Sequence, residues 1–178
     1  MRTKTESAEV LYADDRIVTV DSAAVAEMKR ASEKNERRRI RLCTHRGVDD
    51  RLHEMVIVHA LDTYVRPHKH VGKSESFHVI EGEVDVVIFE EDGAVADVIR
   101  MGPFQSGRPF FYRIADPLFH TLLVRSPVLV FHETTSGPFK RGETVFAPWA
   151  PEDANREAVA GFLTRLNESV AAPRSPRT

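Results

Sequence analysis

Between residues 39 and 133 the chain is divided into short runs of alternating polar and apolar residues, separated by clusters of Gly, Pro, Asp and Ser. A period of two is typical of half-buried β-strands. Many short strands separated by turn residues predict a sandwich or a small barrel. The expected strands are Arg39–Cys43, His53–His59, Tyr64–His70, Glu75–Glu81, Glu83–Phe89, Val95–Arg100, Phe110–Ala115, Phe119–Arg125 and Val128–Glu133.

Helical patterns flank this strand-rich region. Asp21 and Ser22 offer an N-cap for a helix that should end near Asn35, and Ala158–Val170 places its apolar side chains on one face. The last residues carry prolines and no apolar pattern, so we expect disorder there. The sequence therefore predicts a mainly β protein with an N-terminal segment carrying a helix (1–37), a barrel (38–151), a C-terminal helix (152–170) and a disordered tail (171–178).

Composition narrows the class of protein. The 178 residues suit one domain, and a net charge of −2 gives no bulk electrostatic reason to bind nucleic acid or a membrane. With the single cysteine Cys43 no disulfide forms within the chain, and the polar N-terminus shows no signal peptide, so we expect a cytoplasmic protein. The basic run Arg37–Arg39 is interpreted as a solvated junction after the first helix, with anion binding as the alternative.

The most specific pattern is His68-Lys69-His70, followed by Glu75 and Gly82. A spacing of two along a strand places both imidazoles on one face, about 7 Å apart along the chain. Glu75 then returns on the next strand, and Gly82 suits the corner after it. A His-x-His pair alone is weak evidence, but the whole pattern rarely occurs by chance. It predicts a metal site, with two surface histidines and a solvated glutamate as the alternative.

Strand position predicts the roles of the other histidines. His120 is predicted to be the fourth ligand, with a hydrogen-bonded core histidine as the alternative, and His132 is the reserve ligand. His78 has the opposite strand parity to Glu75, so we expect it to face away from the metal in a packing or interface role. Structural roles are expected for the three histidines near the first barrel strands: His45, His53 and His59.

Three imidazoles and one carboxylate suit a divalent transition metal, one of Fe, Mn, Ni, Co, Cu or Zn, rather than calcium or magnesium. Four protein ligands on an octahedral ion leave two positions for water, dioxygen or a substrate oxygen. Strand parity extends the inward face to Tyr64 and Arg66. Arg66 is a candidate for holding a carboxylate or phosphate, or else a paired structural arginine, and Tyr64 is a candidate for supplying a proton.

The pattern resembles the first motif of the cupin superfamily: His68-x-His70, four residues, Glu75, six residues, Gly82. His120 stands where the second cupin motif places its histidine. Segments that include Lys73–His78 and 146–151 are similar to those of the WbuC-type cupin-fold metalloproteins, and the resemblance runs from about residue 38 to 152. It implies a cupin barrel, a bound divalent metal, a homodimer and a link with O-antigen and surface-polysaccharide synthesis.

These observations favour a metal-dependent cupin that binds or acts on a small carbohydrate-derived or anionic metabolite. Isomerase-like or epimerase-like Lewis-acid chemistry would place Glu75 or Tyr64 near the reacting carbon. The alternatives are an Fe(II)-dependent dioxygenase, which uses the same ligand types, and a non-catalytic sugar-binding sensor or scaffold. The expected partners are a small molecule and a second copy of the chain. For Val84, Val86 and Ile88, a core position is favoured over an exposed dimer edge.

Overall fold

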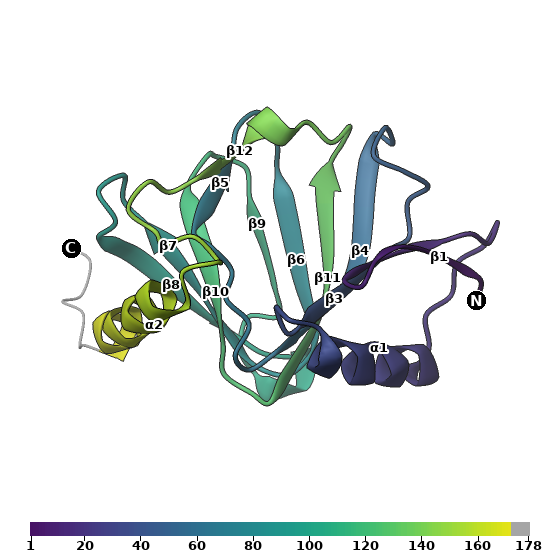
Figure 1. Ribbon diagram of the computed structural model, residues 1–178, viewed down its shortest axis with the longest axis horizontal. Coiled ribbons are helices and arrows are strands. Elements are labelled where there is room, and N and C mark those ends of the chain that lie inside the picture. Colours follow the sequence, from purple (N-terminus) through teal and green to yellow (C-terminus); the bar gives the residue numbers. More distant parts are fainter. Residues whose placement is uncertain (172–178) are drawn as a thin grey trace.

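Two β-sheets pack face to face in the computed structural model, which describes residues 1–171 (Figure 1). The first sheet has seven strands in the order β1-β2-β3-β4-β11-β6-β9, and the second has five in the order β12-β5-β10-β7-β8. All neighbouring strands are antiparallel except β2 and β3. The predicted mainly β fold is confirmed. The strands of the first sheet are β1 (Thr3–Ser7), β2 (Val10–Ala13), β3 (Arg39–Cys43), β4 (Leu52–Ala60), β6 (Glu75–Glu81), β9 (Phe111–Ile114) and β11 (Val128–Ser136), and those of the second are β5 (His68–His70), β7 (Val84–Phe89), β8 (Val95–Met101), β10 (Phe119–Val124) and β12 (Thr144–Phe146).

The space between the sheets is filled by the inward side chains of both. Phe77 of β6 and Phe131 of β11 stack at its centre, with 4.1 Å between ring centroids, and both are almost fully buried. Val84, Val86 and Ile88 of β7 belong to the same core, as favoured from the sequence, and do not form an exposed edge. Alternation along each strand therefore sends one set of side chains into this core and the other set outward.

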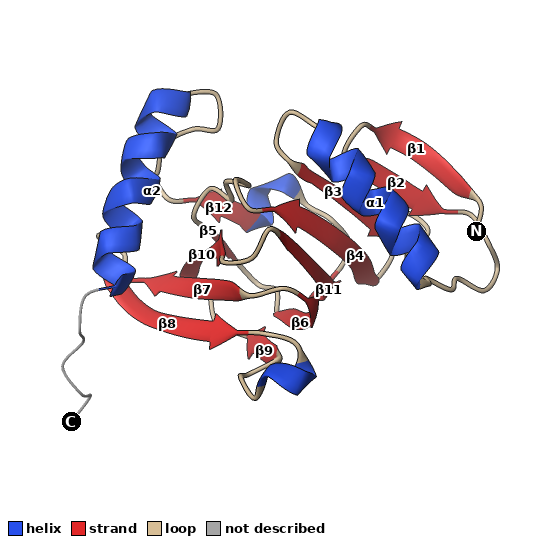
Figure 2. Ribbon diagram, turned by 90° about the horizontal axis from the view of Figure 1, so that it is seen from below, coloured by secondary structure: helices blue, strands red, loops and turns tan. Residues whose placement is uncertain are grey.

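Each sheet has a helix on its outer face (Figure 2). Helix α1 (Ser22–Lys34) begins at Asp21, whose carboxylate accepts a hydrogen bond from the Ala24 N–H, and Met28 packs against the first sheet. Helix α2 (Arg156–Ala171) packs Leu166 and Val170 against the second sheet. The predicted ends of α1 and the amphipathic range 158–170 agree with the structure within two residues, whereas the broader bounds 152–170 begin four residues before α2. Neither is long and apolar enough to cross a membrane. The predicted disordered tail lies outside the described residues, except Ala171, which ends α2.

The strand prediction was wrong at three places. Strand β1 was missed because Thr3–Ser7 is polar and exposed throughout, and the four-residue strand β2 was missed because its sequence, VLYA, does not alternate. The three-residue strand β12 was missed because it is too short to show a period. The predicted strand Tyr64–His70 is also too long: only β5 forms, and Pro67, which has no N–H to donate, stands immediately before it. Two short 3₁₀ turns, Phe104–Ser106 and Arg141–Glu143, complete the secondary structure.

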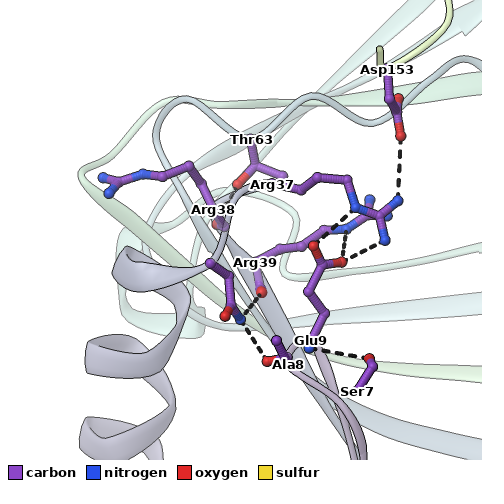
Figure 3. Close-up of polar contacts among 9 residues, drawn as sticks. Ser7, Ala8, Glu9, Arg37, Arg38, Arg39, Thr63 and Asp153 are labelled. Carbon is purple, nitrogen blue, oxygen red and sulfur yellow. Dashed lines mark hydrogen bonds and ion pairs between the residues drawn. The ribbon is translucent and has the colours of Figure 1, made fainter.

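The basic run after α1 ties the N-terminal hairpin to the rest of the molecule (Figure 3). Arg37 and Arg39 both reach the Glu9 carboxylate, at 2.6 Å and 3.2 Å, and Arg37 also contacts Asp153 at 3.4 Å. Glu9 lies in the turn between β1 and β2, whereas Asp153 precedes α2. These two arginines are therefore paired with carboxylates, so the junction holds distant segments together.

Gly82, the last residue of the histidine-containing motif, is required by the corner between β6 and β7. Its φ is 86°, and a Cβ there would lie 2.1 Å from the Val128 carbonyl oxygen and 2.5 Å from Ser126 Oγ. We predict that Gly82→Ala lowers the free energy of unfolding by at least about 2 kcal/mol, through backbone strain and the clash with the Val128 carbonyl. Urea denaturation measures the change. Gly47→Ala is the control, because a Cβ at Gly47 meets nothing within 4 Å; equal losses in both variants would contradict the prediction.

Candidate metal centre

Three strands bring four metal-type side chains together at one end of the core. His68 and His70 come from β5, His120 from β10 and Glu75 from the facing sheet, on β6. One ligand atom from each lies within 4.8 Å of the others. The His70 Nε2 to Glu75 Oε2 distance is 3.2 Å, and the His120 Nε2 to Glu75 Oε1 distance is 3.8 Å. The four residues predicted as ligands therefore form a single cluster.

The register of the strands explains this convergence. His120 is the direct partner of His68 in the β10–β5 pair, so both imidazoles stand on the same face of the second sheet. His70 follows two residues later on that face. Glu75 begins β6 and shares the parity of Phe77, which lies in the core between the sheets. The cluster consequently joins the two sheets at the end of β6 where the apolar core stops.

Each imidazole is oriented by a contact at Nδ1, which leaves its Nε2 atom available to bind a metal. The Nδ1 atoms of His68 and His120 lie 2.9 Å from the carbonyl oxygens of Arg66 and Leu118, so each Nδ1–H can donate to a backbone acceptor. His70 Nδ1 is 3.2 Å from the Thr144 hydroxyl on β12. This arrangement leaves Nε2 of each ring for a metal, and such outer contacts orient ligating histidines in metalloproteins. The donor set and its orientation thus fit a transition-metal ion.

The charge states in the cluster also suit metal binding. Burial, followed by the neighbouring His120, lowers the pKa of His68 to about 4, so its imidazole is neutral at pH 7. Burial acts to raise the pKa of Glu75, but the hydrogen bond with His70 and the nearby imidazoles outweigh it and lower that pKa. Ionised carboxylate and neutral imidazole are the forms in which these side chains ligate metals.

A tyrosine that the sequence reasoning missed supports the carboxylate. The Tyr112 hydroxyl donates a 2.9 Å hydrogen bond to Glu75 Oε1, and both side chains are buried. Tyr112 lies on β9, where it pairs with Phe77, the inward residue two positions after Glu75. Alternation within the predicted strand Phe110–Ala115 could have indicated an inward Tyr112, but no sequence signal placed β9 beside β6.

A second carboxyl side chain, also missed, lies close to the cluster. Glu133 on β11 has the same parity as the core residue Phe131 and therefore points between the sheets. Burial, and then the Glu75 carboxylate, raises the pKa of Glu133 to about 8, and Arg41 acts in the opposite direction. By fractional exposure the Glu133 residue is half-buried. A proton-carrying group therefore stands beside the candidate metal ligands.

The structure does not bring Tyr64 to the cluster. Its hydroxyl donates to the Pro151 carbonyl at 2.9 Å, and its ring packs edge-on against Phe162 of α2. The predicted inward parity was wrong, because the strand does not extend back past Pro67 and Val65 packs against the core instead.

Arg66 lies near the edge of the cluster. Its guanidinium carbon is 5.0 Å from the centre of the Phe146 ring, and that ring centre is 6.2 Å from the centre of the His68 ring. The ion pair with Glu152 is long, at 3.6 Å, and the Glu152 side chain is 77% exposed. The Arg66 Nε is buried and has no hydrogen-bond partner among the described residues. Arg66 therefore retains hydrogen-bonding capacity beside His68.

The remaining histidines lie outside the four-residue cluster. His78 is exposed on β6, as its parity predicted, and it pairs with the reserve ligand His132 of β11 on the outer face. His45 and His53 stack with 4.1 Å between centroids, and His45 Nδ1 contacts the Glu54 backbone. His59 packs edge-on against Phe131.

Solvent reaches the cluster on the His70 side, where this side chain is 19% exposed, whereas that of His120 is only 4% exposed. Two cavities of the fold lie elsewhere. One, of about 580 Å³, lies between α2 and the segment around Trp149, and another, of about 370 Å³, lies between β7–β8 and β9 with Tyr112 in its wall. None of the four cluster residues lines either of these two cavities.

Known proteins resemble this chain in part of its sequence and in its fold. A model described as "Domain of unknown function (DUF6016)" matches residues 20–101, which is less than half of the chain. No curated protein matches the sequence. Among solved structures, a protein from Shewanella oneidensis aligns with a TM-score of 0.49 and 6% identity over 74% of this chain and 81% of that one. KdgF from Halomonas sp. aligns with a TM-score of 0.45 and 14% identity over 58% and 82% of the two chains.

The capsular polysaccharide assembling protein CapF from Staphylococcus aureus aligns with a TM-score of 0.50 and 16% identity. The alignment covers 63% of this chain but 32% of CapF, so this chain spans about a third of that protein. At such low identity the likeness concerns the fold and not the activity. Together with the two facing sheets, it shows that the chain has a cupin fold.

Proposed function

We propose that this protein is a metal-dependent cupin that binds and transforms a small carbohydrate-derived, anionic metabolite. The observation that carries the proposal is the cluster of His68, His70, Glu75 and His120, whose ligand atoms lie within 4.8 Å of one another. Its donor types favour one divalent transition metal, from Fe, Mn, Ni, Co, Cu and Zn. The specific relationship to WbuC-type cupins, with their link to surface polysaccharides, is part of the proposal and is supported by the sequence segments alone.

A bound transition metal would supply Lewis-acid polarisation of a substrate oxygen. The residues of the chain divide the remaining tasks. Glu75 is held by Tyr112 and anchors the cluster to the first sheet. Arg66, which lies next to the Phe146 ring near His68, would bind the anionic group of the substrate. Polarising a substrate oxygen acidifies the adjacent C–H bond, and fixing a nearby anion positions it, which supports isomerase-like or epimerase-like proton transfer as the reaction class.

The first prediction from the proposed function concerns metal content. We expect purified protein to contain about one equivalent of a divalent transition metal per chain, as a four-ligand site requires. His70→Ala should lose most of it, because one of four ligands is removed. His78→Ala is the matched control, since His78 lies on the outer face of β6 and is exposed. Elemental analysis of the three proteins measures the outcome. A His70→Ala protein with full metal content would refute the ligand assignment.

The second prediction concerns Tyr112, which contacts the carboxylate ligand but not the metal. Removing its hydroxyl in Tyr112→Phe takes away the hydrogen bond to Glu75 Oε1 and lets the carboxylate rotate. We expect metal affinity to fall by roughly 10- to 100-fold, as is usual when a hydrogen bond to a metal-ligating side chain is lost. Competition with a chromophoric chelator measures the affinity. An unchanged affinity, with the fold intact by circular dichroism, would show that Tyr112 does not position Glu75.

The third prediction tests the reaction class. Isomerisation or epimerisation exchanges a carbon-bound proton next to a carbonyl group with solvent. We expect metal-loaded protein in D₂O to incorporate deuterium into at least one member of a panel of hexoses, hexuronates and hexose phosphates, as measured by proton NMR. His70→Ala should abolish the exchange, whereas His78→Ala should retain it. Metal-loaded protein that exchanges no member of the panel would argue against this reaction class.

A further inference from the structure

An exposed aromatic side chain stands directly beside the histidine cluster. Phe146 of β12 is the register partner of His68 of β5. Because directly paired residues of neighbouring strands share a face, Phe146 points to the inner face of the second sheet, as His68 does. The centre of its ring lies 6.2 Å from that of the His68 ring. Strand β12 therefore extends the face that carries three of the four cluster residues.

Phe146 is 51% exposed, although it points to the inner face of its sheet. Strand β12 is the outermost strand of the second sheet, so no further strand covers the ring from that side. Within residues 1–171, Phe146 belongs to none of the three apolar cores. Single exposed apolar side chains are common on protein surfaces, so exposure alone indicates no function. What distinguishes this ring is that it is open to solvent next to a candidate metal ligand.

The second neighbour of the Phe146 ring is Arg66. The guanidinium carbon lies 5.0 Å from the ring centre, within the range of a cation–π contact. The Arg66 side chain is 21% exposed, and it is the group assigned above to the anion of the substrate. One aromatic ring therefore adjoins both the candidate anion-binding group and a candidate metal ligand.

An exposed aromatic ring suits the C–H face of a sugar ring. A pyranose carries its hydroxyl groups around the edge and C–H groups on its faces, so stacking removes apolar surface from water and leaves the hydroxyl groups free. An open-chain sugar acid or sugar-alcohol phosphate has similar charge and hydroxyl groups but no rigid apolar face. It also loses more conformational freedom on binding. Phe146 can therefore recognise the ring form of a ligand, while Arg66 recognises its charge.

We propose that Phe146 is the platform on which the ring of a cyclic, anionic sugar derivative stacks while Arg66 binds its carboxylate or phosphate. This assignment rests on the proposed function and deepens it. It narrows the ligand class from carbohydrate-derived anions to those in ring form, and it adds a specificity-determining residue. Phe146 contributes no metal-binding atom, so its role is separable from that of the cluster.

Isothermal titration of the full, metal-loaded chain tests the assignment with four probes in two matched pairs. Glucuronate and gluconate are carboxylates with and without a ring, and glucose 6-phosphate and sorbitol 6-phosphate are the corresponding phosphates. Wild-type protein should bind the ring member of at least one pair roughly tenfold more tightly, the order that an aromatic contact supplies. Phe146→Ala should reduce this preference to about twofold or less, because the aromatic face is lost. The pair that binds more tightly identifies carboxylate or phosphate as the recognised anion.

Matched variants separate stacking from other effects. Phe146→Tyr keeps a flat aromatic face and should retain the ring preference. Arg66→Met should weaken all four probes by a similar factor, because it removes the partner of the anion. Phe111→Ala is the control: Phe111 is 52% exposed, but it pairs with His78 on the outer face of the first sheet and should bind all probes like wild type. If Phe146→Ala does not fold by circular dichroism, Phe146→Leu, which is apolar but not flat, replaces it.

Three results would overturn the assignment. The first is failure of every probe to bind folded wild-type protein. The second is an equal ring preference in wild type and Phe146→Ala. The third concerns a second copy of the chain as the occupant of the exposed ring. If Phe146→Ala lowers the mass measured by light scattering and leaves all probe affinities unchanged, the ring is a subunit contact and not a platform.

Metal content keeps this test distinct from that of the proposed function. Phe146→Ala should contain as much metal as wild type, because Phe146 does not belong to the cluster. Titrations are made with metal-loaded and chelated protein. A chelated wild type that keeps its affinity and its ring preference would refute metal-dependent binding and keep the platform. A metal-loaded wild type that binds both members of each pair equally would refute the platform and keep the metal site.

Discussion

The pairing of His120 with His68 is the interaction on which the candidate site depends. It fixes the register of β10 against β5, and that register places His68, His70 and His120 opposite Glu75 of the facing sheet. A one-residue slip would turn the imidazoles of the slipped strand to the outer face, where α2 packs. The apolar core beneath the cluster sets the separation of the sheets, so packing and ligand geometry are determined together.

Local patterns in the sequence predicted much of this arrangement. The period of two located most of the barrel strands, and the Asp21 cap and the apolar face of residues 158–170 located both helices. The spacing of His68, His70 and Glu75 reports a strand, a turn and a strand, which are all local features. These signals could be read without knowing which strands become neighbours.

Other parts depend on contacts between distant segments. Strand β1 is polar and forms only because β2 pairs with it and β2 in turn pairs with β3. Tyr112 and Glu133 lie near the cluster because β9 and β11 are the two neighbours of β6. The sequence of these strands does not indicate that order. Tyr64 was misplaced for the opposite reason: parity was extended through Pro67, where the strand had not yet begun.

Charged side chains in and beside the first sheet are paired for two different purposes. Three imidazoles and the Tyr112 hydroxyl surround Glu75 and stabilise its ionised carboxylate. Arg37 and Arg39 form ion pairs with Glu9, and these pairs hold the N-terminal hairpin against the rest of the molecule (Figure 3).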